Sequence, residues 1–412
     1  MRVVLFTGKG GVGKTTTAAA TAVHAARCGV KTLVVSADPA HSLADALGVR
    51  LEARPTEVSA GLFGQQVDPR ARSERSWREI QEYLVVALDE LGVDPLAADE
   101  LTELPGADEV FSLLEVRDQV RHGPWGLVVV DCAPSAETLR LLAVPEVLTR
   151  YVRRLLPMER RIARIVGVTR RPGWSRAGGT GGVGGTGLPL PGDGVVEAAE
   201  RFAAELAGVQ EVLRSPATSV RLVLTAESVV LAETRRTWTA LAMHGFAVDA
   251  VVANRLFDAE SADPWQQGWA RTQAQVLTEA EMSFAPVPVQ RAGYTAAEPV
   301  GFAALAALGE SLYGPAVPEA ATALLEPPSL PDPFVVERET AGFVLRLALP
   351  LADRKDLDLG RRGDDLVVTV EGRRRVLALP SALRRCQVDS AQLRDGVLAV
   401  RFVPDPDQWR PM

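Results

Sequence analysis

The stretch that decides the fold lies near the N-terminus and reads Gly8-Lys9-Gly10-Gly11-Val12-Gly13-Lys14-Thr15. It matches the pattern GxxxxGK[ST] and stands between a strand-like apolar run and a helical, alanine-rich run, the context in which this motif binds phosphate. Glycines let backbone N–H groups curve around phosphates without Cβ clashes, and the helix that begins near Lys14 adds the positive end of its dipole. The loop therefore predicts a nucleoside triphosphate site in which Lys14 reaches the β- and γ-phosphates and the Thr15 hydroxyl binds Mg²⁺.

The sequence on either side of this loop alternates between strands and helices. Buried strands are expected at 3–7, 32–36, 127–130, 220–224 and 248–253, with helices at 14–28, 197–213 and 229–244. Such alternation over residues 1–315 predicts an α/β fold, a P-loop NTPase domain built on a mostly parallel sheet.

Two segments interrupt this alternation. A glycine-rich stretch predicts a flexible loop over residues 177–194, and a proline- and alanine-rich stretch predicts a linker over residues 316–333. Beyond the linker the chain changes character, because turn residues separate the β-like runs at 334–349, 365–371, 375–379 and 397–403. These runs predict a small all-β sandwich domain over residues 334–404.

Composition excludes several classes of protein. The chain has 412 residues, 47% hydrophobic and 24% charged, which is ordinary for a globular protein of two or three domains. Its net charge of −7 argues against binding nucleic acid through bulk charge, and no apolar stretch approaches the about 18 residues of a membrane span. Three scattered cysteines exclude a disulfide framework or a CxxC metal site, and the strand-like N-terminus lacks a signal peptide, so we expect a cytoplasmic protein.

The second lysine of the loop carries a resemblance to a known branch of P-loop proteins. With Lys9, the loop resembles the deviant Walker A motif of the branch that includes ParA, MinD, the nitrogenase iron protein and the ArsA family. In that branch the extra lysine reaches across a dimer interface to the phosphates of the partner subunit. The resemblance implies that Lys9 acts in catalysis with Lys14, and that the protein forms a nucleotide-sandwich homodimer.

Two further stretches resemble ArsA and the ATPase that targets tail-anchored proteins. Residues 36–43 closely resemble the family's switch I, whose aspartate positions or deprotonates the attacking water, and this implies a catalytic role for Asp38. Residues 131–140 resemble switch II, so Asp131, which closes a hydrophobic strand, is expected to support Mg²⁺. Ala136 and Glu137 stand where the family has Gly-His. This departure leaves the magnesium chemistry intact, but it affects how loss of the γ-phosphate is signalled to the rest of the protein.

Two later strand ends complete this resemblance. In the family, an asparagine after the strand at 251–253 hydrogen-bonds the adenine, which implies that role for Asn254; an asparagine that ends a strand is also a common turn former. The family's glutamate at the position of Glu227 lies near the nucleotide across the dimer, and residues 287–289 match its last strand. The expected ATP-binding residues are Gly8, Lys9, Gly10, Gly11, Val12, Gly13, Lys14, Thr15, Thr16, Glu227 and Asn254.

The C-terminal region carries a separate resemblance. Residues 366–372, 379–380 and 393–400 resemble the last core strands of the small heat-shock protein (α-crystallin) domain. Apolar residues alternate at Leu366, Val368 and Val370, as a half-buried sandwich strand requires. An unrelated β-sandwich would show the same alternation.

Together these resemblances imply a Mg-dependent, dimeric ATPase of the ArsA family. A heat-shock-like domain favours the handling or targeting of hydrophobic polypeptide clients. We therefore expect such a client or a membrane partner, and no nucleic acid is expected to bind. The first alternative is an ATPase subunit that energises export of arsenite or another anion, although Cys28, Cys132 and Cys386 do not indicate a trigonal thiolate site. The second alternative is a positioning ATPase like ParA or MinD.

Overall fold

The computed structural model describes residues 1–37, 42–67, 107–132, 193–327 and 334–406, and these form two compact units. The first unit holds the described residues of 1–66, 123–139 and 213–412, and the second those of 67–122 and 140–212. Within these described ranges, no helix combines the length and the apolar character that crossing a bilayer requires.

An eight-stranded sheet forms the centre of the first unit. Its order is β3-β4-β2-β5-β1-β6-β7-β8, and every neighbouring pair is parallel except β3 with β4. The strands are β1 (Arg2–Gly8), β2 (Thr32–Ser36), β3 (Thr56–Ser59), β4 (Leu62–Gln66), β5 (Leu127–Asp131), β6 (Thr218–Thr225), β7 (Val248–Leu256) and β8 (Val289–Gly293). Strands β1, β2 and β5 are buried along their whole length, which matches their unbroken apolar sequence. The predicted parallel α/β fold is confirmed.

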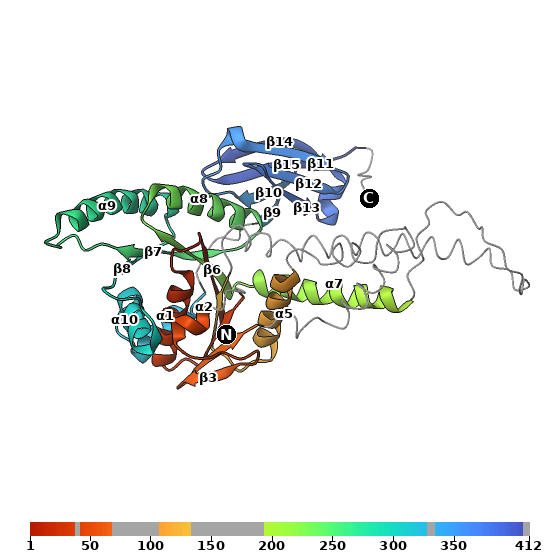
Figure 1. The fold of residues 1–412 in the computed structure, drawn as a ribbon. Coiled ribbons are helices and arrows are strands. Elements are labelled where there is room, and N and C mark those ends of the chain that lie inside the picture. Colours follow the sequence, from red (N-terminus) through yellow and green to blue (C-terminus); the bar gives the residue numbers. More distant parts are fainter. Residues whose placement is uncertain (38–41, 68–106, 133–192, 328–333, 407–412) are drawn as a thin grey trace, which may run out of the picture. The chain divides into compact units, whose positions relative to one another are not determined.

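Helices cover both faces of this sheet. Figure 1 shows α8 (Ser228–Met243) and α9 (Pro264–Phe284) on one face, and α1 (Lys14–Arg27), α2 (Ser42–Leu47) and α10 (Gly301–Tyr313) on the other. Strand β5 lies between β1 and β2 in the sheet, so the connection from β1 through α1 crosses over it. In such sheets, ligands bind outside the carboxyl ends of the strands, where the strand order reverses.

The observed elements differ from the predicted ones in several places. The last strand begins at Val289, whereas residues 287–289 were expected to form it. Helix α9 was not predicted at all. The predicted linker over residues 316–333 contains a helix, α11 (Pro318–Leu325). The predicted loop over residues 177–194 lies almost entirely outside the described residues, although Asp193 and Gly194 begin a helix.

The second unit contains two described helices, α5 (Ala107–His122) and α7 (Asp193–Leu213). They pack closely at Gly208, where an added Cβ would lie 3.1 Å from Cδ of Arg117. Arg117 also donates a hydrogen bond to the carbonyl oxygen of Glu205 (3.1 Å), so the two helices are joined by both packing and polar contacts. Helix α7 confirms the helix expected at 197–213.

Residues 334–404 form two antiparallel sheets packed face to face, here called the β-sandwich domain. One sheet has the order β14-β15-β10-β9 and the other β11-β12-β13. Their strands are β9 (Phe334–Glu339), β10 (Gly342–Ala348), β11 (Leu357–Arg362), β12 (Asp365–Val370), β13 (Arg373–Ala378), β14 (Cys386–Arg394) and β15 (Val397–Pro404), with a short helix α12 (Ser381–Arg384). Leu366, Val368 and Val370 are all buried in the shared core, as their alternation predicts. The run expected at 334–349 is a hairpin of two strands.

Candidate active site

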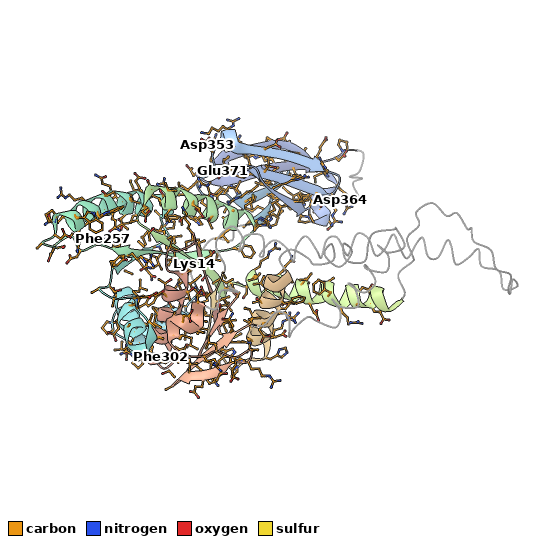
Figure 2. All side chains as sticks on the ribbon, viewed as in Figure 1. Lys14, Phe257, Phe302, Asp353, Asp364 and Glu371 are labelled. Atoms are coloured by element: carbon orange, nitrogen blue, oxygen red, sulfur yellow. The ribbon has the colours of Figure 1, made fainter. Side chains whose placement is uncertain are left out.

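The glycine-rich loop connects the end of β1 to the start of α1. Gly8 must be glycine because an added Cβ would lie 2.2 Å from the carbonyl oxygen of Val223, its partner on β6. Gly11 and Gly13 have φ angles of 83° and 93°, in the left-handed region that favours glycine. Gly13 is the N-cap of α1, so the helix begins at Lys14, which Figure 2 labels. The first N–H groups of a helix have no partner within the helix and are therefore free to bind an anion at the loop.

Lys14 is the buried cation of this loop, with only 7% of its surface exposed. The described ranges place no carboxylate in a salt bridge with Lys14, and they provide no hydrogen-bond partner for the hydroxyls of Thr15 and Thr16. A buried charge without a partner is unfavourable unless a ligand neutralises it. The lysine, the helix N-terminus and two available hydroxyls therefore form a set that suits a polyphosphate anion.

The first turn of α1 is stabilised separately from this set. The Thr17 hydroxyl donates to the carbonyl oxygens of Gly13 and Lys14, both at 2.9 Å. Thr17 thus holds the turn from inside the protein, while Thr15 and Thr16 stay available on the other side of the helix start.

Asp131 ends the buried strand β5 and is itself fully buried. In the sheet it lies between Phe6 of β1 and Ser36 of β2, and its carbonyl oxygen accepts a hydrogen bond from the N–H of Ala37 (2.9 Å). The carboxylate therefore ends its strand beside the strand that carries the phosphate loop. Hydroxyl and carboxylate oxygens are the kinds of ligand that Mg²⁺ prefers, and the predicted magnesium roles of Thr15 and Asp131 stay predictions.

Two predicted parts of the site lie outside the described residues. Asp38 belongs to the range 38–41, and residues 133–140 of the predicted switch II belong to the range 133–192. Their roles stay predictions.

Asn254 has a contact that sequence reasoning missed. Its side chain is buried, and Nδ2 donates to the carbonyl oxygen of Val12 in the phosphate loop at 2.9 Å. The same nitrogen lies 2.3 Å from where a Cβ on Gly13 would be, so the amide packs directly against the loop. Asn254 therefore braces the loop, and its predicted contact with adenine remains a prediction.

A second buried amide supports the chain just after Asn254. Gln273 of α9 donates from Nε2 to the carbonyl oxygen of Arg255 (3.1 Å) and accepts at Oε1 from the N–H of Phe257 (2.8 Å). Arg255 has a φ of 60°, an uncommon conformation for a residue with a side chain. The two hydrogen bonds hold the chain in this turn at the edge of the site.

A cavity of about 330 Å³ adjoins the phosphate loop next to Asn254. Its lining includes Thr16 at the start of α1, Arg255, Tyr294 and Pro299. The Tyr294 ring stacks on Phe257 with centroids 5.3 Å apart, and Figure 2 labels Phe257 at this end of the sheet. The cavity gives the site a second compartment beside the one for phosphate. Sequence reasoning missed Tyr294, which directly follows β8.

Lys9 and Glu227 both lie at the exposed end of the site. Glu227 is the N-cap residue of α8, and its Oε1 accepts a hydrogen bond from the Thr225 hydroxyl (3.0 Å). The Lys9 side chain is 40% exposed, and its Nζ lies 3.7 Å from Oε2 of Glu233, also on α8. In a single chain, Lys9 therefore points to α8, whereas Lys14 is enclosed by the loop.

A buried ionic network anchors the sheet at the opposite ends of these strands. Asp249 pairs with Arg2 at 2.9 Å and with Arg221 at 3.2 Å. Burial lowers the pKa of Arg2. Burial also acts to lower the pKa of Arg221, but Asp249 and Tyr313 outweigh it, and the net pKa is raised. The buried carboxylate of Asp249 is therefore paired with two guanidinium groups.

The network continues to the helix of the phosphate loop. Tyr313 of α10 accepts from Arg221 (2.9 Å) and shares a hydrogen bond of 2.7 Å with the Thr21 hydroxyl on α1. His24, one turn further along α1, is fully buried and has no hydrogen bond to either ring nitrogen within the described residues. Burial, and then the charge of Arg27, lower the pKa of His24. Helix α1 is thus fixed against α10 by packing around the buried His24 ring, whose centroid lies 5.3 Å from that of Tyr313.

The three cysteines do not form a metal site. All three are buried: Cys28 directly follows α1, Cys132 directly follows β5, and Cys386 begins β14. Burial raises the pKa of Cys28 and of Cys386, which disfavours the thiolate form that binds soft ions. Over the described part of the chain, no three His, Cys, Asp or Glu side chains are grouped to hold a metal ion.

Comparison with known proteins agrees with this geometry. Residues 1–314 match the family model for the anion-transporting ATPase ArsA, and residues 340–402 match the model for the HSP20-like domain found in ArsA. An uncharacterized protein of Streptomyces coelicolor is 40% identical over 99% of both chains. Proteins of Chlorobaculum tepidum and Aquifex aeolicus, whose names are "Putative arsenical pump-driving ATPase" and "Putative arsenical pump-driving ATPase 1", are 33% and 32% identical. The alignment with the Chlorobaculum tepidum protein covers 98% of this chain and 96% of that protein. The alignment with the Aquifex aeolicus protein covers 97% of this chain and 99% of that protein.

The family matches cover both the phosphate loop with its sheet and the β-sandwich domain. They confirm the predicted resemblance to ArsA and to the heat-shock domain, and they identify the phosphate loop as the centre of an ATP-hydrolysing P-loop enzyme. The chain therefore belongs to the ArsA family of anion-transporting ATPases, with an HSP20-like β-sandwich domain at its C-terminal end.

Proposed function

We propose that the chain hydrolyses MgATP as a nucleotide-sandwich homodimer and uses the cycle to handle hydrophobic polypeptide clients. The observation that carries the nucleotide part is Lys14, a buried cation at a helix N-terminus that has no salt-bridge partner within the described ranges. Because Lys14 and the loop N–H groups are already in place, they would stabilise the charge that develops on the γ-phosphate without reorganising.

Each residue of the site has a separate task in this proposal. The loop from Gly8 to Thr16 binds the phosphates, and Asn254 keeps the loop in shape through Val12. Mg²⁺, held by Thr15 with support from Asp131, would neutralise charge on the phosphate oxygens when bound. Asp38, by the family resemblance, would orient the attacking water.

The dimer is proposed from the position of Lys9. Its side chain is half-exposed on the rim of the loop, pairs with α8 and does not reach into its own phosphate site. An ammonium on a long flexible side chain in this place can reach a phosphate presented by a second subunit. Glu227, exposed at the start of the same helix, would lie at that junction.

The client is proposed from the β-sandwich domain. A heat-shock-like fold joined to an ATPase supports the handling of unfolded or membrane-bound polypeptides, and we expect this work in the cytoplasm. The names of two relatives favour a second candidate, a pump for arsenicals. Against that candidate, all three thiols are buried and lie in different elements.

Stimulation of ATP hydrolysis separates the two candidates. The purified protein is assayed with a hydrophobic helical peptide, with a scrambled polar peptide as the control, and with arsenite or antimonite. We expect the hydrophobic peptide alone to raise the rate, and Lys14→Ala to abolish turnover under every condition. A rate that rises with arsenite and ignores the peptide would replace the client proposal with the pump.

A further inference from the structure

Helix α8 contacts the phosphate loop near its beginning and the β-sandwich domain near its end. Its second turn carries Glu233, the partner of Lys9 at 3.7 Å. Its last two turns carry the carbonyl and hydroxyl groups that bind the β-sandwich domain. One helix therefore touches both a residue of the ATP site and the β-sandwich domain.

Two hydrogen bonds begin the contact with the β-sandwich domain. Arg373 of β13 donates to the carbonyl oxygen of Arg236 at 3.0 Å, and the buried Thr239 hydroxyl donates to the carbonyl oxygen of Pro350. In both bonds a side chain donates to a backbone carbonyl oxygen, so α8 and the β-sandwich domain each supply one donor and one acceptor.

The end of the helix is built into the domain. Met243 is fully buried among the core residues of the sandwich, and its carbonyl oxygen accepts a hydrogen bond from the buried guanidinium of Arg375. A cation at a helix C-terminus also interacts favourably with the negative end of the helix dipole. Since positions 236, 239 and 243 follow the spacing of one helix face, the sandwich binds a continuous stripe of α8.

We infer that the β-sandwich domain controls the ATP site through α8, by setting how firmly Glu233 holds Lys9 in its own subunit. Lys9 has two alternative partners, Glu233 in the same chain and the phosphates of the partner subunit. Docking of the β-sandwich domain fixes α8 and favours the pair between Lys9 and Glu233. Closure of the dimer on ATP favours the contact between Lys9 and the phosphates of the partner subunit. The inference rests on the proposed role of Lys9 across the dimer.

Thermodynamic linkage gives the expected direction. If docking favours the pair between Lys9 and Glu233, ATP binding must weaken docking by the same factor. Loss of docking or loss of the Glu233 charge should then lower the ATP concentration needed for half-maximal hydrolysis. Because the pair is half-exposed, the expected shift is about two- to fivefold.

Matched substitutions along α8 and β13 test the docking contact. The docking variant combines Thr239→Val with Arg373→Ala, and its control combines Thr237→Val with Arg374→Ala. Thr237 and Thr239 are both buried, and each hydroxyl bonds a carbonyl oxygen one turn earlier in the helix. Only Thr239 also bonds the carbonyl oxygen of Pro350 in the β-sandwich domain. Hydrogen exchange of the amides at 236–243 should rise in the docking variant and stay at the wild-type level in the control.

The half-saturating ATP concentration tests the coupling. We expect it to fall in the docking variant and in Glu233→Gln, and to stay unchanged in the control. The two changes combined should shift it by less than the product of their separate factors, because both act on the same pair.

Two results would overturn the inference. One is unchanged exchange at 236–243 in the docking variant, and the other is raised exchange with an ATP response equal to that of the control. Failure of the proposed dimer is a different result, because the molecular mass of the wild-type protein in solution would then not change with ATP. The hydrogen-exchange and half-saturation measurements would still report on docking and on coupling.

Discussion

Replacement of Asn254 by alanine separates its observed contact with the phosphate loop from its predicted contact with adenine. The change removes the hydrogen bond of 2.9 Å to the carbonyl oxygen of Val12 and leaves that buried acceptor without its donor. An unsatisfied buried group costs about 1–3 kcal/mol. If the loop must be reordered when phosphate binds, that free energy weakens binding by about 5- to 140-fold.

Calorimetric titration with ATP and with tripolyphosphate, both with Mg²⁺, measures the effect. Bracing of the loop predicts that Asn254→Ala weakens both ligands by a similar factor, because tripolyphosphate has no base. Gln273→Ala is the matched control, since it removes a buried amide that holds the same strand end without touching the loop. It should lower the free energy of unfolding and leave tripolyphosphate binding unchanged. Tripolyphosphate binding that is the same in Asn254→Ala and wild type would refute the bracing role.

Three further substitutions test the framework of the site. Gly8→Ala places a Cβ 2.2 Å from a carbonyl oxygen of β6, so urea unfolding should show a loss of about 1–3 kcal/mol. Arg221→Met leaves the buried Asp249 with one cation fewer and should cost about 3–5 kcal/mol in the same assay. The lowered pKa of His24 means that the folded state binds fewer protons than the unfolded state, so wild-type stability should fall as the pH drops below about 6.5. His24→Leu should remove part of that fall in thermal melts, whereas the exposed-site variant His122→Gln should keep it.

Local sequence patterns predicted the elements around the phosphate loop well. Strand β1, helix α1 and strand β5 are unbroken apolar or alanine-rich runs with clear ends, and the loop motif places them relative to a phosphate. The β-sandwich strand β12 followed from its alternation. In each case the signal is contained in a few adjacent residues.

Elements with weaker local signals were missed. Helix α9 begins with Asp263 as N-cap and Pro264 at its first position, a start signal that was present and not used. Strand β14 exposes most of its residues, so it has no apolar alternation to find. Helix α11 begins at a proline within a stretch whose composition indicated a linker.

Contacts distant in sequence could not be predicted. The hydrogen bond from Asn254 to Val12 joins residues 242 positions apart, and the packing of Met243 into the β-sandwich core depends on the arrangement of two domains. Asn254 was chosen for its predicted contact with a base, whereas its observed partner is the protein itself. Tertiary contacts of this kind follow from strand order and helix packing, which a local pattern does not contain.

The central claim is that Lys9 acts on the nucleotide of the partner subunit. A mixture of Lys9→Ala and Asp38→Asn subunits tests it most directly, with each variant alone and the wild type as references. In a mixed dimer, the Lys9→Ala subunit keeps its own Asp38 and receives Lys9 from its partner, so one complete site forms. The account predicts that two nearly inactive proteins regain up to about a quarter of the wild-type rate on mixing, because half of the dimers are mixed and each has one complete site. A mixture no more active than the two variants measured separately would contradict it.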